Sequence, residues 1–66
     1  METFELIVGQ GSYELHCPEG AKELTFPTLL AAFAYAQVSM AEEHAQMVVH
    51  AGDGSKESLP LYRMTA

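Results

Sequence analysis

The sequence predicts an α+β fold in which one helix packs on one face of a four-stranded antiparallel sheet. Two stretches of alternating side chains come first, a long uncharged stretch of helix-forming residues follows, and two short β-prone runs come last. The predicted element order is therefore β-β-α-β-β within one domain, residues 1–66. With a right-handed crossover that skips one strand position, the sheet order is 2-1-3-4.

The first two strands are predicted from Phe4 to Val8 and from Tyr13 to Cys17. Both segments alternate apolar and other side chains with a period of two, which is typical of half-buried strands. Between them, residues 9–12 read Gly-Gln-Gly-Ser, and glycine readily adopts the positive φ of a tight connection. We interpret this segment as a hairpin turn and not as a phosphate-binding loop, because no helix follows it.

A single helix is predicted from residue 28 to about residue 43. Residues 17–21 form a loop that leads to Phe26, and Pro27 suits the first turn of a helix. The uncharged stretch 24–41 is long enough for a short membrane span. Its alanines, polar side chains and proline favour a packed helix instead, so we predict no membrane insertion.

This helix has two apolar stripes. The residues predicted to face the sheet are Leu29, Phe33, Ala36 and Met40, with Leu30 at their flank. The opposite stripe, predicted to be an oligomer interface, consists of Ala31, Ala34, Tyr35, Val38 and Glu42. Small domains often gain stability by association, so the second stripe predicts a homodimer. The alternative to a dimer interface is an alanine-rich helix face that is exposed to solvent and binds no partner.

The last two strands are predicted at residues 46–51 and 58–63. Residues 52–55, Gly-Asp-Gly-Ser, lack the ligand series of a calcium loop, so we interpret them as a turn. Pro60 has no N–H to donate, which confines the last strand to an edge of the sheet.

The histidines are the candidates for metal binding. If the helix covers the face with Phe4 and Leu6, then Glu5, Glu14 and His16 point outward, and His50 can join them. Strands lie about 4.8 Å apart, so His16 and His50 could converge on one metal. Solvated histidines are the simpler interpretation, and we predict no metal and no cofactor. His44 is expected to interact with the C-terminal end of the helix dipole.

No catalytic motif is present in the sequence. Cys17 follows His16, and adjacent strand residues point to opposite faces, so a structural cysteine is the better interpretation. No serine elbow or glutamate pair is recognisable, and we predict that the protein is not an enzyme. A single cysteine and the absence of a basic, signal-like N-terminus indicate the cytoplasm.

The charge of the chain narrows the range of partners. Nine acidic and three basic residues give a formal net charge of -6. Such a field repels phosphate backbones and anionic lipids, which excludes nucleic acid and membrane surfaces as preferred partners. The sequence therefore predicts a non-enzymatic protein-interaction domain.

Two resemblances accompany these predictions. The helix opening Phe26-Pro27-Thr28 and the run 48–54, Val-Val-His-Ala-Gly-Asp-Gly, resemble a group of short uncharacterised bacterial proteins with the same layout. This resemblance implies a small cytoplasmic α+β domain and no functional residue. Residues 4–36 are similar to HicB-type antitoxins, which implies, as an alternative, an acidic inhibitor of a small basic toxin. The loop at residues 17–20 departs from that family, and no DNA-binding segment follows.

Overall fold

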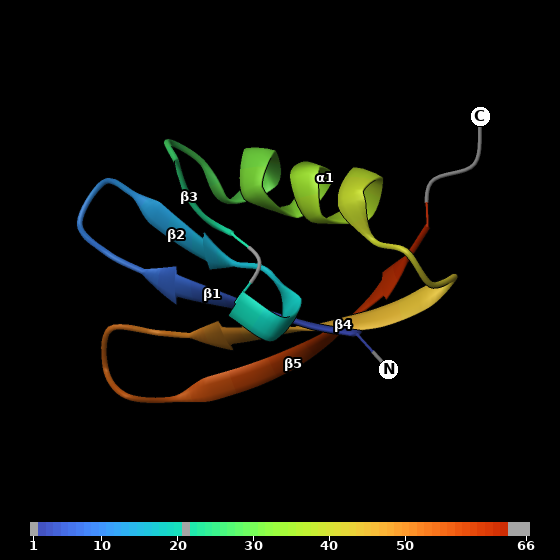
Figure 1. The fold of residues 1–66 in the computed structure, drawn as a ribbon. Coiled ribbons are helices and arrows are strands. Elements are labelled where there is room, and N and C mark those ends of the chain that lie inside the picture. The colour runs from blue at the N-terminus through green and yellow to red at the C-terminus, as the bar shows by residue number, and fades with distance from the viewer. Residues whose placement is uncertain (1, 21, 64–66) are drawn as a thin grey trace.

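The structure is a computed structural model that describes residues 2–20 and 22–63. Within these residues, one helix lies on one face of a mixed five-stranded sheet with the strand order β3-β2-β1-β4-β5 (Figure 1). The elements are β1 (Glu2–Val8), β2 (Tyr13–His16), the 3-10 turn η1 (Pro18–Gly20), β3 (Glu23–Phe26), α1 (Leu29–Ser39), β4 (His44–His50) and β5 (Lys56–Tyr62).

The prediction of four antiparallel strands is wrong in two respects. The segment Glu23–Phe26 is an additional edge strand, β3, and β4 runs parallel to β1. Both differences have one cause. A helical crossover joins parallel strands, so β4 has the direction of β3. Because β3 reverses β2 and β2 reverses β1, β4 also has the direction of β1.

The helix begins as predicted and ends earlier. The Thr28 hydroxyl caps its N-terminus by accepting a hydrogen bond from the Ala31 N–H at 3.1 Å. The C-cap is Met40, and Glu2 Oε1 then accepts the N–H groups of Ala41 and Glu42, each at 2.8 Å. In the described part of the chain, no helix has both the length and the apolar content that crossing a membrane requires.

His44 is the first residue of β4, so its predicted role at the helix C-terminus is wrong. Its ring instead meets the Tyr62 ring edge-on, with 5.5 Å between the centroids. The early end of the helix is the reason, since the chain turns and enters the sheet before residue 44.

The core lies between α1 and the sheet face beneath it. Its buried members are Phe4, Leu6, Leu15, Ala32, Ala36, Met40, Ala45, Met47 and Leu61. The predicted helix stripe is only partly correct, because Ala36 and Met40 are buried, whereas Leu29 is 44% exposed and Phe33 is partly buried. Ala32, absent from the prediction, is fully buried and gives the helix a small contact surface toward the sheet.

Pro60 lies on the edge strand, as predicted. The Arg63 N–H donates to the Glu43 carbonyl at 3.1 Å, and successive N–H groups of a strand point to opposite sides. The nitrogen of Pro60, three residues earlier, therefore points away from β4. The proline removes one outward donor from this edge and makes the edge a poorer template for pairing with another strand.

Candidate functional site

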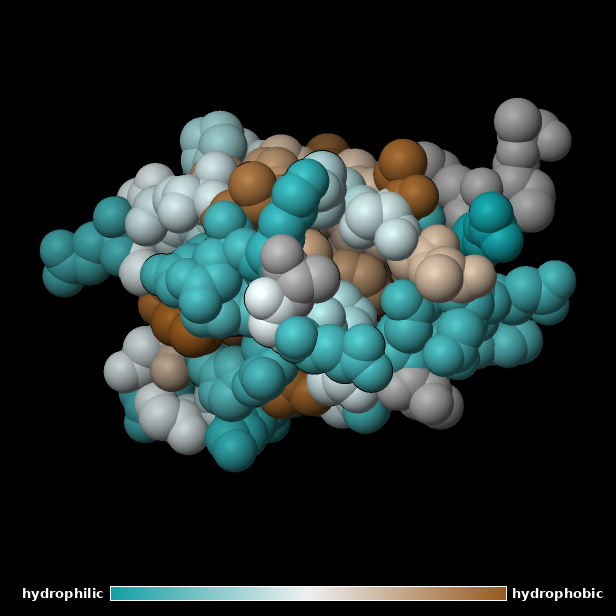
Figure 2. All heavy atoms as spheres, in the orientation of Figure 1, coloured by the Kyte–Doolittle hydropathy of each residue, from teal (hydrophilic) through white to brown (hydrophobic). Residues whose placement is uncertain are grey.

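The outward side of α1 exposes large apolar side chains. Leu30 is 77% exposed and Val38 is 71% exposed, and with Ala34 they form a row four residues apart along the helix. We call Leu30, Ala31, Ala34 and Val38 the outer helix face. Figure 2 shows brown, hydrophobic spheres along the border of the molecule where Figure 1 places α1. The helix, residues 29–39, has no charged side chain.

The predicted interface residues do not all lie on this face. Ala31, Ala34 and Val38 belong to it, whereas Tyr35 is partly buried and packs on Phe26, with 5.5 Å between ring centroids. Glu42 lies beyond the end of the helix. The prediction did not include Leu30, because helical spacing placed it beside the sheet-facing stripe. Leu30 is the second residue of α1, and its side chain is 77% exposed there.

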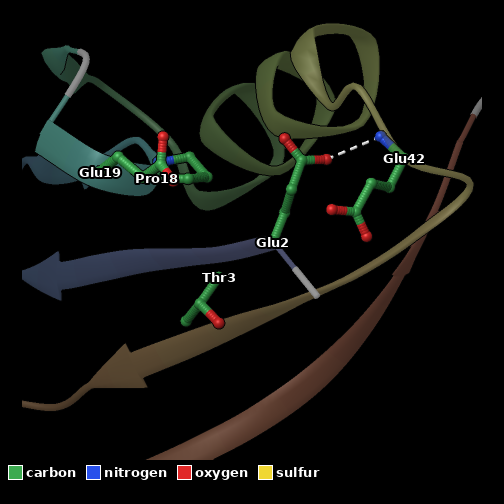
Figure 3. A pocket seen from close by; sticks show the side chains of 5 residues that line it. All are labelled: Glu2, Thr3, Pro18, Glu19 and Glu42. Atoms are coloured by element: carbon green, nitrogen blue, oxygen red, sulfur yellow. Dashed lines mark hydrogen bonds between the residues drawn. The ribbon is translucent and has the colours of Figure 1, made fainter.

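Two adjoining hollows lie beside η1. The larger, about 460 Å³, is lined by Glu2, Thr3, Pro18, Glu19 and Glu42 (Figure 3). The smaller, about 320 Å³, is lined by Glu2, Phe4, Cys17, Pro18, Glu19, Lys22, Tyr35 and Ser39. Glu19 borders both and has a left-handed φ of 60°, which is uncommon for a residue other than glycine. The carboxylates of Glu2, Glu19 and Glu42 make the larger hollow acidic.

Cys17 borders the smaller hollow and packs against the core. Burial raises the pKa of its thiol, and the nearby charge of Lys22 opposes this shift less strongly. The thiol is therefore protonated at neutral pH, which is unfavourable for a nucleophile. His16 lies on the other face of the sheet and cannot act as its base, as the alternation of side chains predicts.

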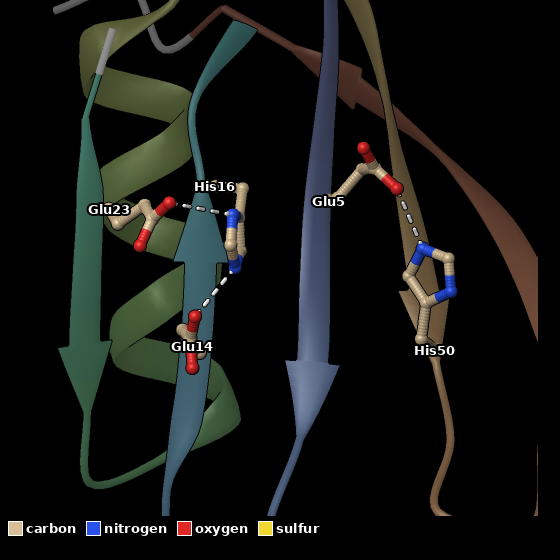
Figure 4. A network of polar contacts seen from close by, with 5 residues as sticks. All are labelled: Glu5, Glu14, His16, Glu23 and His50. Carbon is tan, nitrogen blue, oxygen red and sulfur yellow. Dashed lines mark hydrogen bonds and ion pairs between the residues drawn. The ribbon is translucent and has the colours of Figure 1, made fainter. Parts of the chain in front are cut away.

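The sheet face that α1 leaves open carries a polar network across four strands (Figure 4). His16 Nε2 lies 2.7 Å from Glu14 Oε1, and His16 Nδ1 lies 3.6 Å from Glu23 Oε1. On the neighbouring strands, His50 Nε2 lies 2.8 Å from Glu5 Oε1. We call these five residues the open-face network.

Four members of this network were predicted to share a face, and they do. The two histidines do not converge on one point, because each pairs with its own glutamate. Glu23 was missed because its segment was interpreted as a loop. The alternation of Glu23 and Thr25 with Leu24 and Phe26 is the signal that could have revealed it.

The two glycine-containing connections are turns, as predicted. The N–H of Gly9 donates to the Ser12 carbonyl at 2.9 Å. In the second turn, Asp53 Oδ1 accepts bonds from the Ser55 N–H at 2.9 Å and the Ser55 hydroxyl at 2.6 Å. These bonds, the hydroxyl bond first, lower the pKa of Asp53. The aspartate thus shapes the turn.

No family model, curated protein or solved structure matches this chain. The resemblances to short bacterial proteins and to HicB-type antitoxins therefore stay predictions.

Proposed function

We propose that this chain is a non-enzymatic protein-interaction domain that acts as a homodimer through its outer helix face. The observation that carries the proposal is the exposure of Leu30 and Val38 on a helix without charged side chains. Burial of one such side chain in a contact between two chains stabilises that contact by about 1.5–3 kcal/mol. The single cysteine suits a reducing compartment, and we place the dimer in the cytoplasm.

The lack of charge on the outer helix face makes it the surface where a second copy meets the least electrostatic repulsion. Each chain carries a formal charge of -6, so two copies repel one another, and a contact at an uncharged surface adds the least further repulsion. The outer helix face is such a surface. Ile7 and Tyr62 are also exposed, but Ile7 pairs in register with Glu14 and follows Glu5 on the same sheet face. Two acidic sheet faces would meet there at a higher electrostatic cost.

The small side chains Ala31 and Ala34 suit a contact between two helices. The separation of packed helices depends on the side chains at their contact, and alanine allows close approach. In a symmetric dimer the same face is used twice, so Leu30 and Val38 of one copy meet the equivalent row of the other. Each apolar residue is then buried in both copies.

Solution mass across a dilution series tests this assembly. We expect a dimer for the natural chain and a monomer for Leu30→Asp and Val38→Asp, because each variant places a carboxylate within the contact. Thr25→Asp is the matched control, since it adds the same charge at an exposed position of β3 outside the outer helix face. This control should remain a dimer.

Two results contradict the proposal. One is a natural chain that is monomeric at every concentration. The other is a dimer that persists in both aspartate variants, which would place the contact on a different surface. Circular dichroism of each variant separates lost association from lost folding.

The acidic hollow favours a second candidate, an inhibitor that binds a small basic protein. Glu2, Glu19 and Glu42 surround a volume of about 460 Å³, which suits the cationic side chain of a partner. We expect such a protein to co-purify from the native host with the natural chain and with Glu57→Lys. It should be lost from Glu19→Lys, because only this variant reverses a charge at the hollow. Equal recovery with both variants would contradict this candidate.

A further inference from the structure

We propose that Glu14, His16 and Glu23 bind a divalent transition-metal ion of the zinc or manganese class on the open face of the sheet. Each residue offers one ligand atom, and the three atoms lie within 4.8 Å of one another. This site is separate from the outer helix face, so the inference is independent of the proposed dimer.

The backbone already holds the three residues in place. Glu14 and His16 are two residues apart on β2, so their side chains share a face, and Glu23 lies directly opposite His16 on β3. The hairpin is closed by the Cys17 N–H, which donates to the Lys22 carbonyl at 2.9 Å. Ligands on paired strands are positioned more firmly than ligands on loops.

Only side-chain rotations separate this arrangement from coordination. With metal–ligand bonds of about 2.1 Å, tetrahedral ligand atoms lie about 3.4 Å apart. Glu14 Oε1 lies 2.7 Å from His16 Nε2, whereas Glu23 Oε1 lies 3.6 Å from the other ring nitrogen, Nδ1. To share one ion at Nε2, Glu14 must move away slightly and the Glu23 side chain must rotate to the Nε2 side of the ring. The Glu23 side chain is 68% exposed, and its distance of 3.6 Å from His16 Nδ1 is long for an ion pair. Rotation of the Glu23 side chain therefore breaks no strong contact with this ring.

The donor atoms select the class of metal. One imidazole nitrogen and two carboxylate oxygens suit zinc and manganese, whereas calcium and magnesium prefer ligand sets made of oxygen alone. The site opens to solvent on the outer side, so water molecules complete the coordination.

The local charge favours a cation at His16 over His50. Two carboxylates, those of Glu14 and Glu23, lie next to the His16 ring, whereas the His50 ring has one, that of Glu5. His50 also has Lys56 as its register partner on β5. A divalent ion relieves the repulsion among the carboxylates around His16, whereas Lys56 opposes a cation at His50.

Calorimetric titration of the full, tag-free chain with zinc chloride tests the site. We expect one zinc ion per chain and an affinity at least about tenfold lower in His16→Ala. Glu14→Gln and Glu23→Gln should also bind more weakly. Two controls should bind as the natural chain does, His44→Ala and Cys17→Ser, because they remove two other potential ligands at positions outside the site.

Three results overturn the inference: no zinc binding by the natural chain, equal binding by His16→Ala, or a loss that occurs in Cys17→Ser or His44→Ala instead. The first result would mean that the glutamates and His16 form only ion pairs. If circular dichroism shows that His16→Ala does not fold, the double variant Glu14→Gln/Glu23→Gln decides. Its side chains have the same size as the natural ones, and unchanged binding in this variant overturns the inference equally.

Discussion

Leu15 and Leu30 have the same side chain and opposite environments. Leu15 is fully buried between α1 and the sheet, whereas Leu30 points outward from the first turn of the helix. Burial of the first stabilises the fold, and exposure of the second leaves apolar surface for association. The same side chain therefore has a structural role at one position and a binding role at the other.

We expect Leu15→Ala to lower the free energy of unfolding by about 2–5 kcal/mol, because it leaves a cavity in the core. Urea denaturation measures the change. Leu30→Ala is the matched control, and at concentrations where the chain is monomeric it should cost less than about 0.5 kcal/mol. Equal losses in the two variants would contradict the burial that the structure assigns to these leucines.

The Asp53 carboxyl gives a pH-dependent prediction. Its hydrogen bonds to Ser55 hold its pKa below the ordinary value. Because the folded pKa is the lower one, this stabilisation is present above the unfolded pKa and is lost as the pH falls through the folded pKa. Ser55→Ala removes the hydroxyl bond, so the pKa of Asp53 should rise.

Carbon-detected NMR titration of Asp53 measures this shift. Ser58→Ala is the control, because the Ser58 hydroxyl donates to Gln46 Oε1 at 2.9 Å and has no bond to Asp53. An Asp53 pKa that moves equally in both variants, or in neither, would show that the Ser55 hydroxyl is not the cause.

At the scale of the elements, the short strand β3 decides the direction of everything after it. It has only four residues, yet it reverses the chain once more before the helix. Without β3, the crossover would deliver β4 antiparallel to β1, as the sequence predicts. β3 also places Glu23 opposite His16 and Phe26 against Tyr35, so it contributes to the open-face network and to the support of the helix.

The start of α1 gives a prediction for this element. Thr28→Ala removes the hydroxyl that accepts the Ala31 N–H, and we expect a loss of about 1 kcal/mol in the free energy of unfolding. Thr28→Ser keeps a hydroxyl at the same position and should retain most of the stability. Chemical denaturation of the three chains provides the comparison. A serine variant as unstable as the alanine variant would show that the methyl group matters and the cap does not.

At the scale of the whole molecule, two properties have opposite effects on dimer formation: the negative net charge opposes it, and the uncharged outer helix face favours it. The formal charge of -6 repels a second copy, and the outer helix face attracts it through apolar burial. Salt screens the first effect and leaves the second nearly unchanged.

We therefore expect the proposed dimer to become tighter as sodium chloride is added. Light scattering of a dilution series at low and at moderate ionic strength measures the dissociation constant. A chain with Glu57→Gln, which has one negative charge fewer on β5, should show a smaller dependence on salt. Dissociation by salt would instead indicate that ionic contacts hold the copies together.

Much of the local structure and part of the candidate sites could be predicted from the sequence. Alternation with a period of two identified the first two strands, and β-prone runs on either side of a glycine turn identified the last two. Alternation also placed Glu5, Glu14 and His16 on one face, where His50 was expected to join them. The absence of charge along the helix marked Ala31, Ala34 and Val38 as a second apolar surface. These features depend on the spacing of neighbouring residues, so they can be read along the chain.

The sequence by itself determined the first and last hairpins, their turns, the start of the helix, the negative net charge and the absence of charge along the helix. Tertiary structure alone decided the direction of β4, the membership of Glu23 in the network and the end of α1. Directly after the helix, the N–H groups of Ala41 and Glu42 donate to the carboxylate of Glu2, some 40 residues earlier in the chain. Such features depend on contacts between residues far apart in the chain, and local periodicity contains no information about which distant partners will meet.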